Sequence, residues 1–364
     1  MKGQVNMGKN KSKTRSAIIT ADTHLKRKPG LWSGRSEIAG DDEFSFEQLV
    51  DYAIKNKTDL YLLGDVLDAV TNMPRPLCIL NKQMDRLKDA GIVVRYIQGN
   101  HEMVAGGAHE QEPWLAIFNN AENIHEKTFD FMGMKAYGIE YVPLAFAPLA
   151  LCKVPSDVEV LFMHGTVDSV TPFNHHFEAD MIPDHVKYVF AGDWHEHAVV
   201  DINEDQKLYY PGSTYLCSSS EAAEKFFLEV STDMTIESIP LQTRNIVKLS
   251  EISGQLDDLD KVLAVDDTLP EDLQRPIVIV DEPCTQDTYA HLSKYAHMYT
   301  LGKATADALD IDVTVTDVLS NEEILAQCMD KEKYPDEFNF VLDVIENPVG
   351  DSIDRLKERL CVEV

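Results

Sequence analysis

The feature that most constrains the fold of this chain is a short apolar run that recurs and ends abruptly in Gly, Asp, Asn or His. The runs occupy residues 16–24, 59–65, 92–102, 158–165, 188–197 and 207–214. Runs of about four to eight apolar residues are typical of buried strands covered on both faces. Stretches with helical apolar spacing, such as 47–54 and 78–87, lie between several of them. The alternation predicts an α/β fold whose strand-end loops are available for chemistry.

Histidine, aspartate and asparagine gather at these strand ends, although each alone would more often be an ordinary loop or core residue. A nitrogen and oxygen donor set suits manganese, iron or zinc better than a structural thiolate site does. Asp22 and His24 are two residues apart, so in extended backbone both side chains point to the same side. His195 and His197 have the same spacing. With the two-oxygen carboxylate of Asp65 as a bridge, these pairs predict two cations about 3.5–4 Å apart.

Charge is unevenly distributed along the 364 residues. Residues 1–40 carry nine Lys and Arg against two acids, a net of +7, so the other 324 residues carry −36 of the total of −29. Such an acidic body repels a polyanion at long range. Any nucleic-acid role must therefore depend on bound metals, the basic N-terminal stretch or a partner protein.

The N-terminal residues and the cysteines indicate the cellular compartment in which the protein works. No apolar run reaches the about 18 residues of a membrane span. Residues 1–15 are basic with no apolar stretch after them, so we expect a flexible tail and not a secretory signal. Six scattered cysteines lack C-x-x-C spacing, which indicates a reducing compartment. We therefore expect a cytoplasmic protein.

The pattern changes after about residue 225. Residues 226–230 and 234–241 predict a closing pair of strands. Beyond them we expect a strand over 276–280, a helix over 287–309, a strand over 311–315 and further helices opening at Ser320. The expected domains are a tail (1–15), a catalytic domain (16–242), a smaller α/β module (243–320) and C-terminal helices (321–364). The apolar stripes of those last helices could pack on the chain's own core or bind a partner.

Five motifs in order resemble the calcineurin-like metallophosphoesterase superfamily over about residues 16–230. They are D-x-H (22–24), G-D-x-x-D (64–68), G-N-H-E (99–102), H-G (164–165) and H-x-H (195–197). The resemblance implies a two-sheet β-sandwich flanked by helices. It also implies one cation on Asp22, His24, Asp65 and His197, and another on Asp65, Asn100, His164 and His195. His101 is then the non-ligand histidine, which donates a proton to the leaving oxygen or stabilises the transition state. Asp68 and Glu102 have supporting roles or are ordinary loop carboxylates.

Within the superfamily the chain is most similar to the SbcD-type nuclease subunits. Residues 22–25 (Asp-Thr-His-Leu) and 211–225 carry the likeness. It implies a manganese-dependent exonuclease and single-strand endonuclease of DNA repair and recombination, with a DNA-capping module at 243–320 and C-terminal helices that bind an SbcC-like coiled-coil ATPase. It also implies a homodimer, in a bacterial cell or a phage-infected host. The alternatives are a stand-alone phosphoesterase for a nucleotide or other small phosphodiester, and a regulatory subunit with a decayed site.

Two departures from family patterns matter. In the superfamily Gly usually precedes the H-x-H pair, whereas here Trp194 does, with Gly192 and Asp193 just before it. No arginine follows Asp68, which disfavours a protein phosphatase, because that arginine would bind the phosphate.

A basic loop follows the first metal motif. Its cations are candidates for contact with a DNA phosphate backbone, against the alternative of a solvated loop: Lys26, Arg27, Lys28 and Arg35. His175 and His176 are further candidates to line the substrate groove.

Overall fold

The structure is a computed structural model, and it describes residues 16–26, 40–69, 74–103, 113–171, 175–218, 221–252, 263 and 266–300. The chain divides into two compact units, 1–305 and 306–364. All described residues belong to the first unit. The tail over 1–15, the strand over 311–315 and the helices expected after residue 320 lie outside the described residues.

Six strands form a first sheet, in the order β12 (Ile236–Leu241), β11 (Lys225–Ser231), β1 (Ser16–Thr20), β2 (Asp59–Leu63), β3 (Val94–Ile97) and β4 (Ala121–Asn123). The strands from β1 to β4 run parallel, while β11 and β12 pair antiparallel at one edge. The closing pair of strands predicted from the sequence is therefore confirmed.

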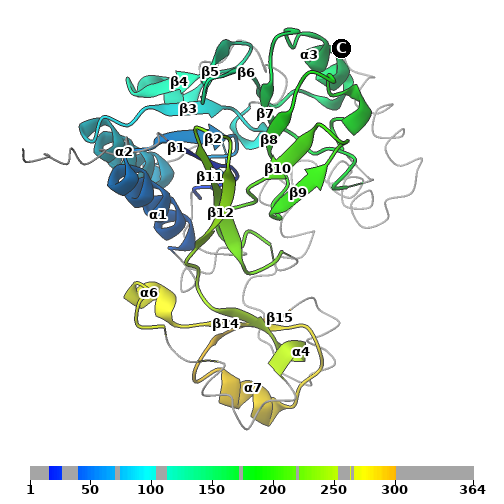
Figure 1. The fold of residues 1–364 in the computed structure, drawn as a ribbon. Helices are drawn as coiled ribbons and strands as arrows, with labels where there is room; N and C mark the ends of the chain where they lie inside the picture. Colours follow the sequence, from blue (N-terminus) through cyan, green and yellow to red (C-terminus); the bar gives the residue numbers. More distant parts are fainter. Residues whose placement is uncertain are drawn as a thin grey trace, which may run out of the picture. The chain divides into compact units, whose positions relative to one another are not determined.

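A second sheet faces the first (Figure 1). Its order is β5 (Thr128–Phe131), β6 (Met134–Ile139), β7 (Val160–His164), β8 (Tyr188–Gly192), β10 (Lys207–Tyr210) and β9 (Ala198–Asp201). The inner strands β6, β7, β8 and β10 are parallel, and β5 and β9 are antiparallel edges.

The main core lies between the two sheets. Alternate residues of β1 and β2 point inward, where Tyr61 stacks on Phe162 with ring centroids 5.2 Å apart, and Phe162 stacks on Phe190 at 5.4 Å. The intervening residue Ile18 belongs instead to a cluster on the outer face, with Leu49 and other helix residues. Because these strands are buried on both faces, their sequence is a continuous apolar run and not an alternating one.

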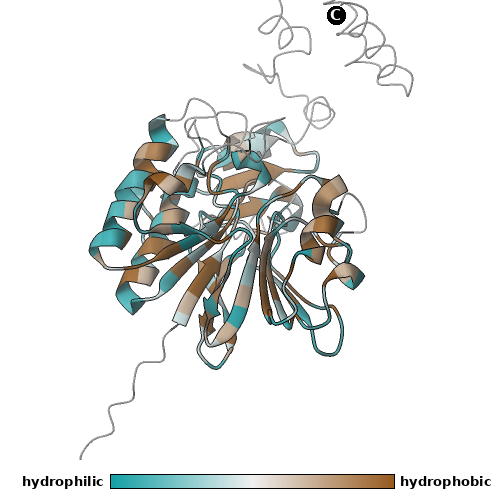
Figure 2. Ribbon diagram, turned by 90° about the horizontal axis from the view of Figure 1, so that it is seen from above, coloured by the Kyte–Doolittle hydropathy of each residue, from teal (hydrophilic) through white to brown (hydrophobic). Residues whose placement is uncertain are grey.

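Helices cover the outer faces. Helices α1 (Asp41–Asn56) and α2 (Pro74–Asp89) pack on the first sheet, and α3 (Ala147–Cys152) packs on the second. Seen from above in Figure 2, the helices beside the sheets are hydrophobic toward the strands and hydrophilic outward. Single-turn helices η1 (Asn100–Glu102), η2 (Trp114–Ile117), η3 (Leu144–Phe146) and η4 (Ala179–Met181) lie in connections. The two-sheet sandwich flanked by helices is confirmed.

A small parallel sheet follows the sandwich, in the order β13 (Ile246–Lys248), β14 (Ile277–Val280) and β15 (His297–Thr300). In the described residues of this region, three short helices accompany the sheet: α4 (Leu249–Ile252), α6 (Glu271–Gln274) and α7 (Gln286–Leu292). None of the helices in the described part of the chain is long and apolar enough to cross a membrane.

The helix predicted over 287–309 is wrong from residue 293 to residue 300. Thr285 caps α7 by accepting a hydrogen bond from the Thr288 amide at 3.1 Å, and the helix ends before Ser293. Residues 297–300 then pair with β14, whose four residues are all buried. A buried central strand needs hydrogen-bond partners on both edges, and this requirement outweighs the helical spacing.

Candidate metal centre

The site is built from loops at the carboxyl ends of parallel strands. After β1, the Asp22 amide donates to the Gly64 carbonyl at 3.1 Å, and the His24 amide donates to the Asp65 carbonyl at 2.9 Å. These bonds join the loop after β1 to the loop after β2. The last residue of β7 and the loops after β3 and β8 supply the remaining side chains, because the carboxyl ends of parallel strands meet at one edge of a sheet.

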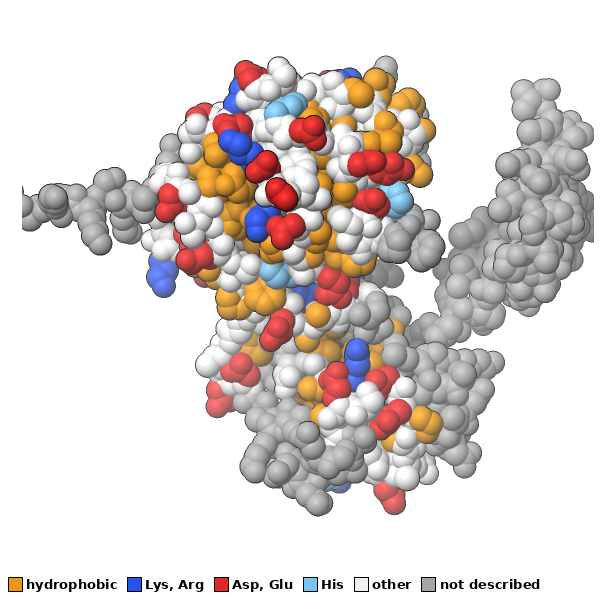
Figure 3. Space-filling model, turned by 45° about the vertical axis from the view of Figure 1, so that its right-hand side comes forward, with side chains coloured by type: hydrophobic (Ala, Val, Ile, Leu, Met, Phe, Trp, Pro, Cys, Tyr) orange, Lys and Arg blue, Asp and Glu red, His pale blue; other side chains and the backbone are white. Residues whose placement is uncertain are grey.

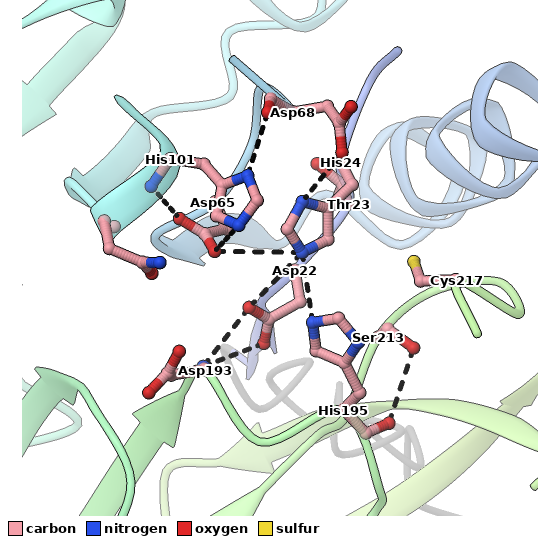
Figure 4. Close-up of polar contacts among 12 residues, drawn as sticks. Asp22, Thr23, His24, Asp65, Asp68, His101, Asp193, His195, Ser213 and Cys217 are labelled. Carbon is pink, nitrogen blue, oxygen red and sulfur yellow. Dashed lines mark hydrogen bonds and ion pairs between the residues drawn. The ribbon is translucent and has the colours of Figure 1, made fainter. Parts of the chain in front are cut away.

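One group of donor atoms gathers around His24. Its Nε2 atom lies 3.1 Å from Nε2 of His195, 3.7 Å from Oδ2 of Asp65 and 4.0 Å from Oδ1 of Asp22. Figure 4 shows these side chains converging from different loops. Asp22, His24 and Asp65 are buried, whereas the side chain of His195 is 31% exposed, so the group opens to solvent on the His195 side.

A second group gathers around His164, at the end of β7. Its Nε2 atom lies 3.1 Å from Oδ1 of Asn100, 3.7 Å from Oδ1 of Asp65 and 3.9 Å from Oδ1 of Asp193. Asp65 thus faces His24 with one carboxylate oxygen and His164 with the other. A single carboxylate between two donor groups is the geometry that a bridging ligand of two cations requires.

His195 and His197, which follow β8, do not lie beside the ligands that the family resemblance implied for them. His195 belongs to the His24 group and not with Asn100 and His164. Both ring nitrogens of His197 are engaged elsewhere: Nδ1 with the Tyr210 carbonyl at 2.8 Å and Nε2 with the Ser238 hydroxyl at 2.9 Å. The expectation that placed His197 on a cation with Asp22 therefore does not match the geometry.

His101 lies at the rim of the cluster, with its side chain 41% exposed. Its Nδ1 atom is 2.8 Å from the Asp68 carbonyl, so Nδ1 carries the hydrogen and donates it. Its Nε2 atom, 3.9 Å from Oδ2 of Asp65, is then the free atom on the cluster side. The backbone amide of His101 donates to Oδ1 of Asp65 at 3.0 Å, which ties both residues together.

Hydrogen bonds on the far side of two rings orient these rings. Nδ1 of His164 contacts the Leu63 carbonyl at 2.6 Å, and Nδ1 of His195 contacts Oε1 of Glu221 at 2.8 Å. Each contact turns Nε2 toward the cluster, as is usual for metal-binding histidines. Glu221 in turn forms a buried ion pair with Lys225 at 2.7 Å. Burial opposes ionisation of Glu221, but His195 and Lys225 lower its pKa to about 2.

Some participants were not among the candidates from the sequence. Glu221 falls within residues 211–225, the stretch whose likeness to a family was noted, so that likeness was the available signal. Asp193 had only its place beside the H-x-H pair as a signal. Cys217 forms a group with His24 and His195 whose donor atoms lie within 4.8 Å of one another. Burial, and next the Glu221 carboxylate, raise the pKa of the Cys217 thiol to about 12, which disfavours the thiolate that binds metals.

The electrostatics of the cluster fit divalent cations. Burial, opposed by His164 and His195 and reinforced by Asp65 and Asp193, raises the pKa of Asp22 to about 7. Burial and neighbouring histidines lower the pKa of His24 well below its usual value, which leaves a neutral ring. Burial lowers the pKa of His164, but Asp65, Asp193 and Asp22 outweigh burial and raise it to about 9. Buried carboxylates are costly without such a compensating positive charge. A cation between them offsets that cost and matches the nitrogen and oxygen donors.

Backbone strain is concentrated at these loops. Asp22, His24, Asp65 and Asp193 adopt positive φ angles of 53°, 37°, 51° and 86°. Residues other than glycine seldom adopt this region, and such strain clusters at functional sites. Glu102 helps to hold it: Oε1 accepts from the Val66 and Leu67 amides at 2.7 and 3.0 Å, and Oε2 accepts from the Gly99 amide at 2.9 Å.

Three of the candidates for substrate contact, Lys26, His175 and His176, lie in the described residues. The Nδ1 atom of His175 is buried and has no hydrogen-bond partner there. The amide of Lys26 donates to Oδ2 of Asp42 at 3.0 Å, and its Nζ atom lies 5.7 Å from the ring centroid of Tyr215. His176 lies 3.3 Å from Oδ2 of Asp193, beside the second donor group. Arg27, Lys28 and Arg35 are outside the described residues.

Comparison with known proteins finds relatives of low sequence identity. No family model matches the chain. It is 27% identical over 203 residues to the uncharacterized metallophosphoesterase YhaO of Bacillus subtilis, a match over 50% of this chain and 47% of YhaO. It is 23% identical over 322 residues to the DNA double-strand break repair protein Mre11 of Methanococcus maripaludis, a match over 79% of this chain and 85% of that protein. The chain thus spans about half the length of YhaO.

Among solved structures, TT1561 of Thermus thermophilus matches 63% of this chain and 100% of its own, at 14% identity and a TM-score of 0.41. The chain is thus similar to a metallophosphoesterase over about half of its length and to Mre11 over most of its length, and it has two six-stranded sheets flanked by helices.

Proposed function

We propose that this protein is a manganese-dependent DNA nuclease, with exonuclease and single-strand endonuclease activity, that hydrolyses phosphodiesters with two cations. The observation that carries the proposal is the position of Asp65 between two donor groups, one around His24 and one around His164. If only one cation were bound, no carboxylate would need to face both donor groups as Asp65 does.

Each side chain then has a task. Asp22, His24, Asp65 and His195 would hold one cation, and Asp65, Asn100 and His164 the other. Bound in this way, the cations would lower the pKa of a water to give hydroxide near neutral pH and would offset charge on the phosphate oxygens. His101, exposed at the rim, would donate a proton from Nε2 to the leaving oxygen when its ring carries a hydrogen on both nitrogens, while Nδ1 keeps its hydrogen on the Asp68 carbonyl. Leu63 and Glu221 keep the rings of His164 and His195 oriented.

DNA is the proposed substrate because the likeness to Mre11, a DNA double-strand break repair protein, extends over most of both chains. The basic loop after β1 supplies the phosphate contacts: Lys26, Arg27, Lys28 and Arg35. We further propose that 243–320 is a DNA-capping module, that 321–364 binds an SbcC-like coiled-coil ATPase, and that the protein acts as a homodimer in DNA repair and recombination.

A small phosphodiester is the alternative substrate, and the charge of the chain favours it. Acidic side chains are spread over the face of the described residues in Figure 3, and residues 41–364 carry −36. The negative potential of the protein would repel the many phosphates of a DNA strand, whereas a small substrate has few charges to repel.

A paired assay tests the proposal. The purified chain is incubated with Mn²⁺ and either labelled single-stranded and double-stranded DNA or bis-p-nitrophenyl phosphate. Asp65→Asn serves as the inactive control, because it weakens both cation sites together. Metal-dependent cleavage of DNA supports the nuclease. Hydrolysis of the small diester with DNA left intact would favour the alternative, and no hydrolysis of either would leave only a regulatory role.

A further inference from the structure

We propose that Asp193 completes the second cation site, in the place that the H-x-H motif predicted for a histidine. This inference rests on the proposed two-cation site. Oδ1 of Asp193 lies 3.9 Å from Nε2 of His164, on the same side of that ring as the donor oxygens of Asp65 and Asn100. The site then has two carboxylates, one amide and one imidazole.

Strand pairing explains why position 193 arrives there. His164 pairs with Gly192 across β7 and β8, so the residue after Gly192 leaves the sheet beside His164. In the superfamily a Gly precedes the H-x-H pair. Counting from Gly192, the two positions of that pair are Asp193 and His195, with Trp194 between them. The pair at 195 and 197 is therefore displaced by two residues from the position where the strand ends.

The carboxylate of Asp193 is held in one orientation. Its backbone has a φ of 86°, and its amide donates to Oδ2 and Oδ1 of Asp22 at 3.0 and 3.2 Å. Its Oδ2 atom lies 3.3 Å from Nδ1 of His176, which leaves Oδ1 toward His164. A strained backbone, fixed by a partner on each side, is the way in which metal ligands are preorganised. His176 is on this view a positioning residue.

The two sites differ in chemistry as a result. The first has two imidazoles, His24 and His195, with the carboxylates of Asp22 and Asp65. The second has a single imidazole, His164, among oxygen donors. Oxygen-rich sets suit Mn²⁺ and Mg²⁺, and imidazole-rich sets bind Zn²⁺ more readily. We therefore expect Zn²⁺ at low concentration to occupy the first site while Mn²⁺ fills the second.

Metal stoichiometry tests the inference without reference to turnover. Mn²⁺ binding to the full chain is measured by calorimetry, and bound Mn²⁺ and Zn²⁺ are counted by mass spectrometry after dialysis. Electron paramagnetic resonance reports coupling between two adjacent Mn²⁺ ions. The variants are Asp193→Asn and Asp193→His, with Asp184→Asn, an exposed aspartate ahead of β8, as the control. Circular dichroism checks that each variant is folded.

The unmodified chain and the control should bind two coupled Mn²⁺ ions. Asp193→Asn should weaken the second ion about tenfold or more and abolish the coupling. Asp193→His should keep two sites and shift the second toward Zn²⁺. Two coupled Mn²⁺ ions with unchanged affinity in both variants would overturn the role of Asp193 alone. Fewer than two ions in the unmodified chain would instead overturn the two-cation proposal.

Discussion

At the scale of single residues, His101 and His164 show how exposure separates roles within one cluster. His164 is fully buried with Nε2 among carboxylates, whereas 41% of the His101 side chain is exposed. A buried ring suits a permanent ligand, because it is shielded from competing water. An exposed ring can reach the oxygen of the alcohol that departs from the phosphate. Predictions for His101 and for Gly99, which lies against Asp65, follow.

Replacing His101 by alanine should slow turnover strongly and leave both metal ions bound. We expect kcat to fall by about 10²- to 10⁴-fold, the usual contribution of a general acid, with two Mn²⁺ ions still bound. Single-turnover hydrolysis and metal counting measure the two effects. His291→Ala, on α7 beside the small sheet, is the matched control. Loss of a metal ion from the His101 variant would mean that His101 is a ligand.

Replacing Gly99 by alanine should damage the site through close approach alone. A Cβ atom on Gly99 would lie 2.0 Å from Oδ1 of Asp65, while φ at Gly99 is an ordinary −95°. We expect weaker Mn²⁺ binding and a loss of about 1–3 kcal/mol in the free energy of unfolding. Gly91→Ala is the control, because nothing lies within 4 Å of its Cβ although its φ is 71°. Unchanged Mn²⁺ affinity in Gly99→Ala would contradict the prediction.

The sequence located most of the cluster, and it failed where backbone conformation departs from an extended strand. Side chains two residues apart point to the same side only in extended backbone. Asp193 has a φ of 86°, so the chain turns before His195, and His197 is directed to Tyr210 and Ser238. Asp22 and His24 also have positive φ, yet they converge because backbone bonds to the loop after β2 hold them. No residue pattern in the sequence predicts the positive φ angle of Asp193 that produces this turn.

At the scale of elements, the strands were predictable because burial on both faces leaves an apolar run with a sharp end, as in β2 and β7. The structure of residues 293–300 was not predictable in this way, because their helical apolar spacing does not show that β14 needs a strand beside it. β15 forms since β14 is apolar and central, and its backbone groups require a partner. Pairing between distant segments is therefore the part of the fold that local pattern misses.

Helix α1 is joined to the sheet by a hydrogen bond that should make stability depend on pH. The Tyr52 hydroxyl donates to Oε2 of Glu229 on β11 at 2.5 Å. Burial, and next the Glu229 carboxylate, raise the pKa of Tyr52 to about 12. A pKa raised in the folded state means that the stabilisation is complete below the unfolded value of about 10. It is lost as the pH rises from there through about 12.

Urea unfolding of the unmodified chain and Tyr52→Phe checks this expectation. At pH 8 the variant should be less stable by about 0.5–1.5 kcal/mol, the contribution of one hydrogen bond. The difference should shrink as the pH rises from 10 toward 12. Tyr188→Phe, in the second sheet, is the matched control. A difference that stays constant between pH 8 and pH 11.5 would show that the hydroxyl acts only by packing.

At the scale of the whole molecule, charge is divided unevenly along the sequence. Residues 1–40, which include the metal motif at 22–24, carry +7, and residues 41–364 carry −36. Composition predicted this division, but it could not tell which cations face a substrate. If DNA is the substrate, the basic loop must offset a repulsive field locally. Salt dependence should then depend on a few residues and not on net charge.

Neutralising the basic loop tests this argument. Arg27, Lys28 and Arg35 are changed together to glutamine, and binding of single-stranded DNA is measured from 50 to 300 mM salt in Ca²⁺, which limits cleavage. Each lost phosphate contact should reduce the slope of log affinity against log salt by about one, with weaker binding at every concentration. Hydrolysis of bis-p-nitrophenyl phosphate should fall much less than cleavage of DNA. The matched control changes Lys55, Lys57 and Lys88, near the C-terminal ends of α1 and α2, to glutamine. It alters net charge equally, so an equal loss of DNA binding in both variants would mean that net charge, and not the loop, governs the interaction.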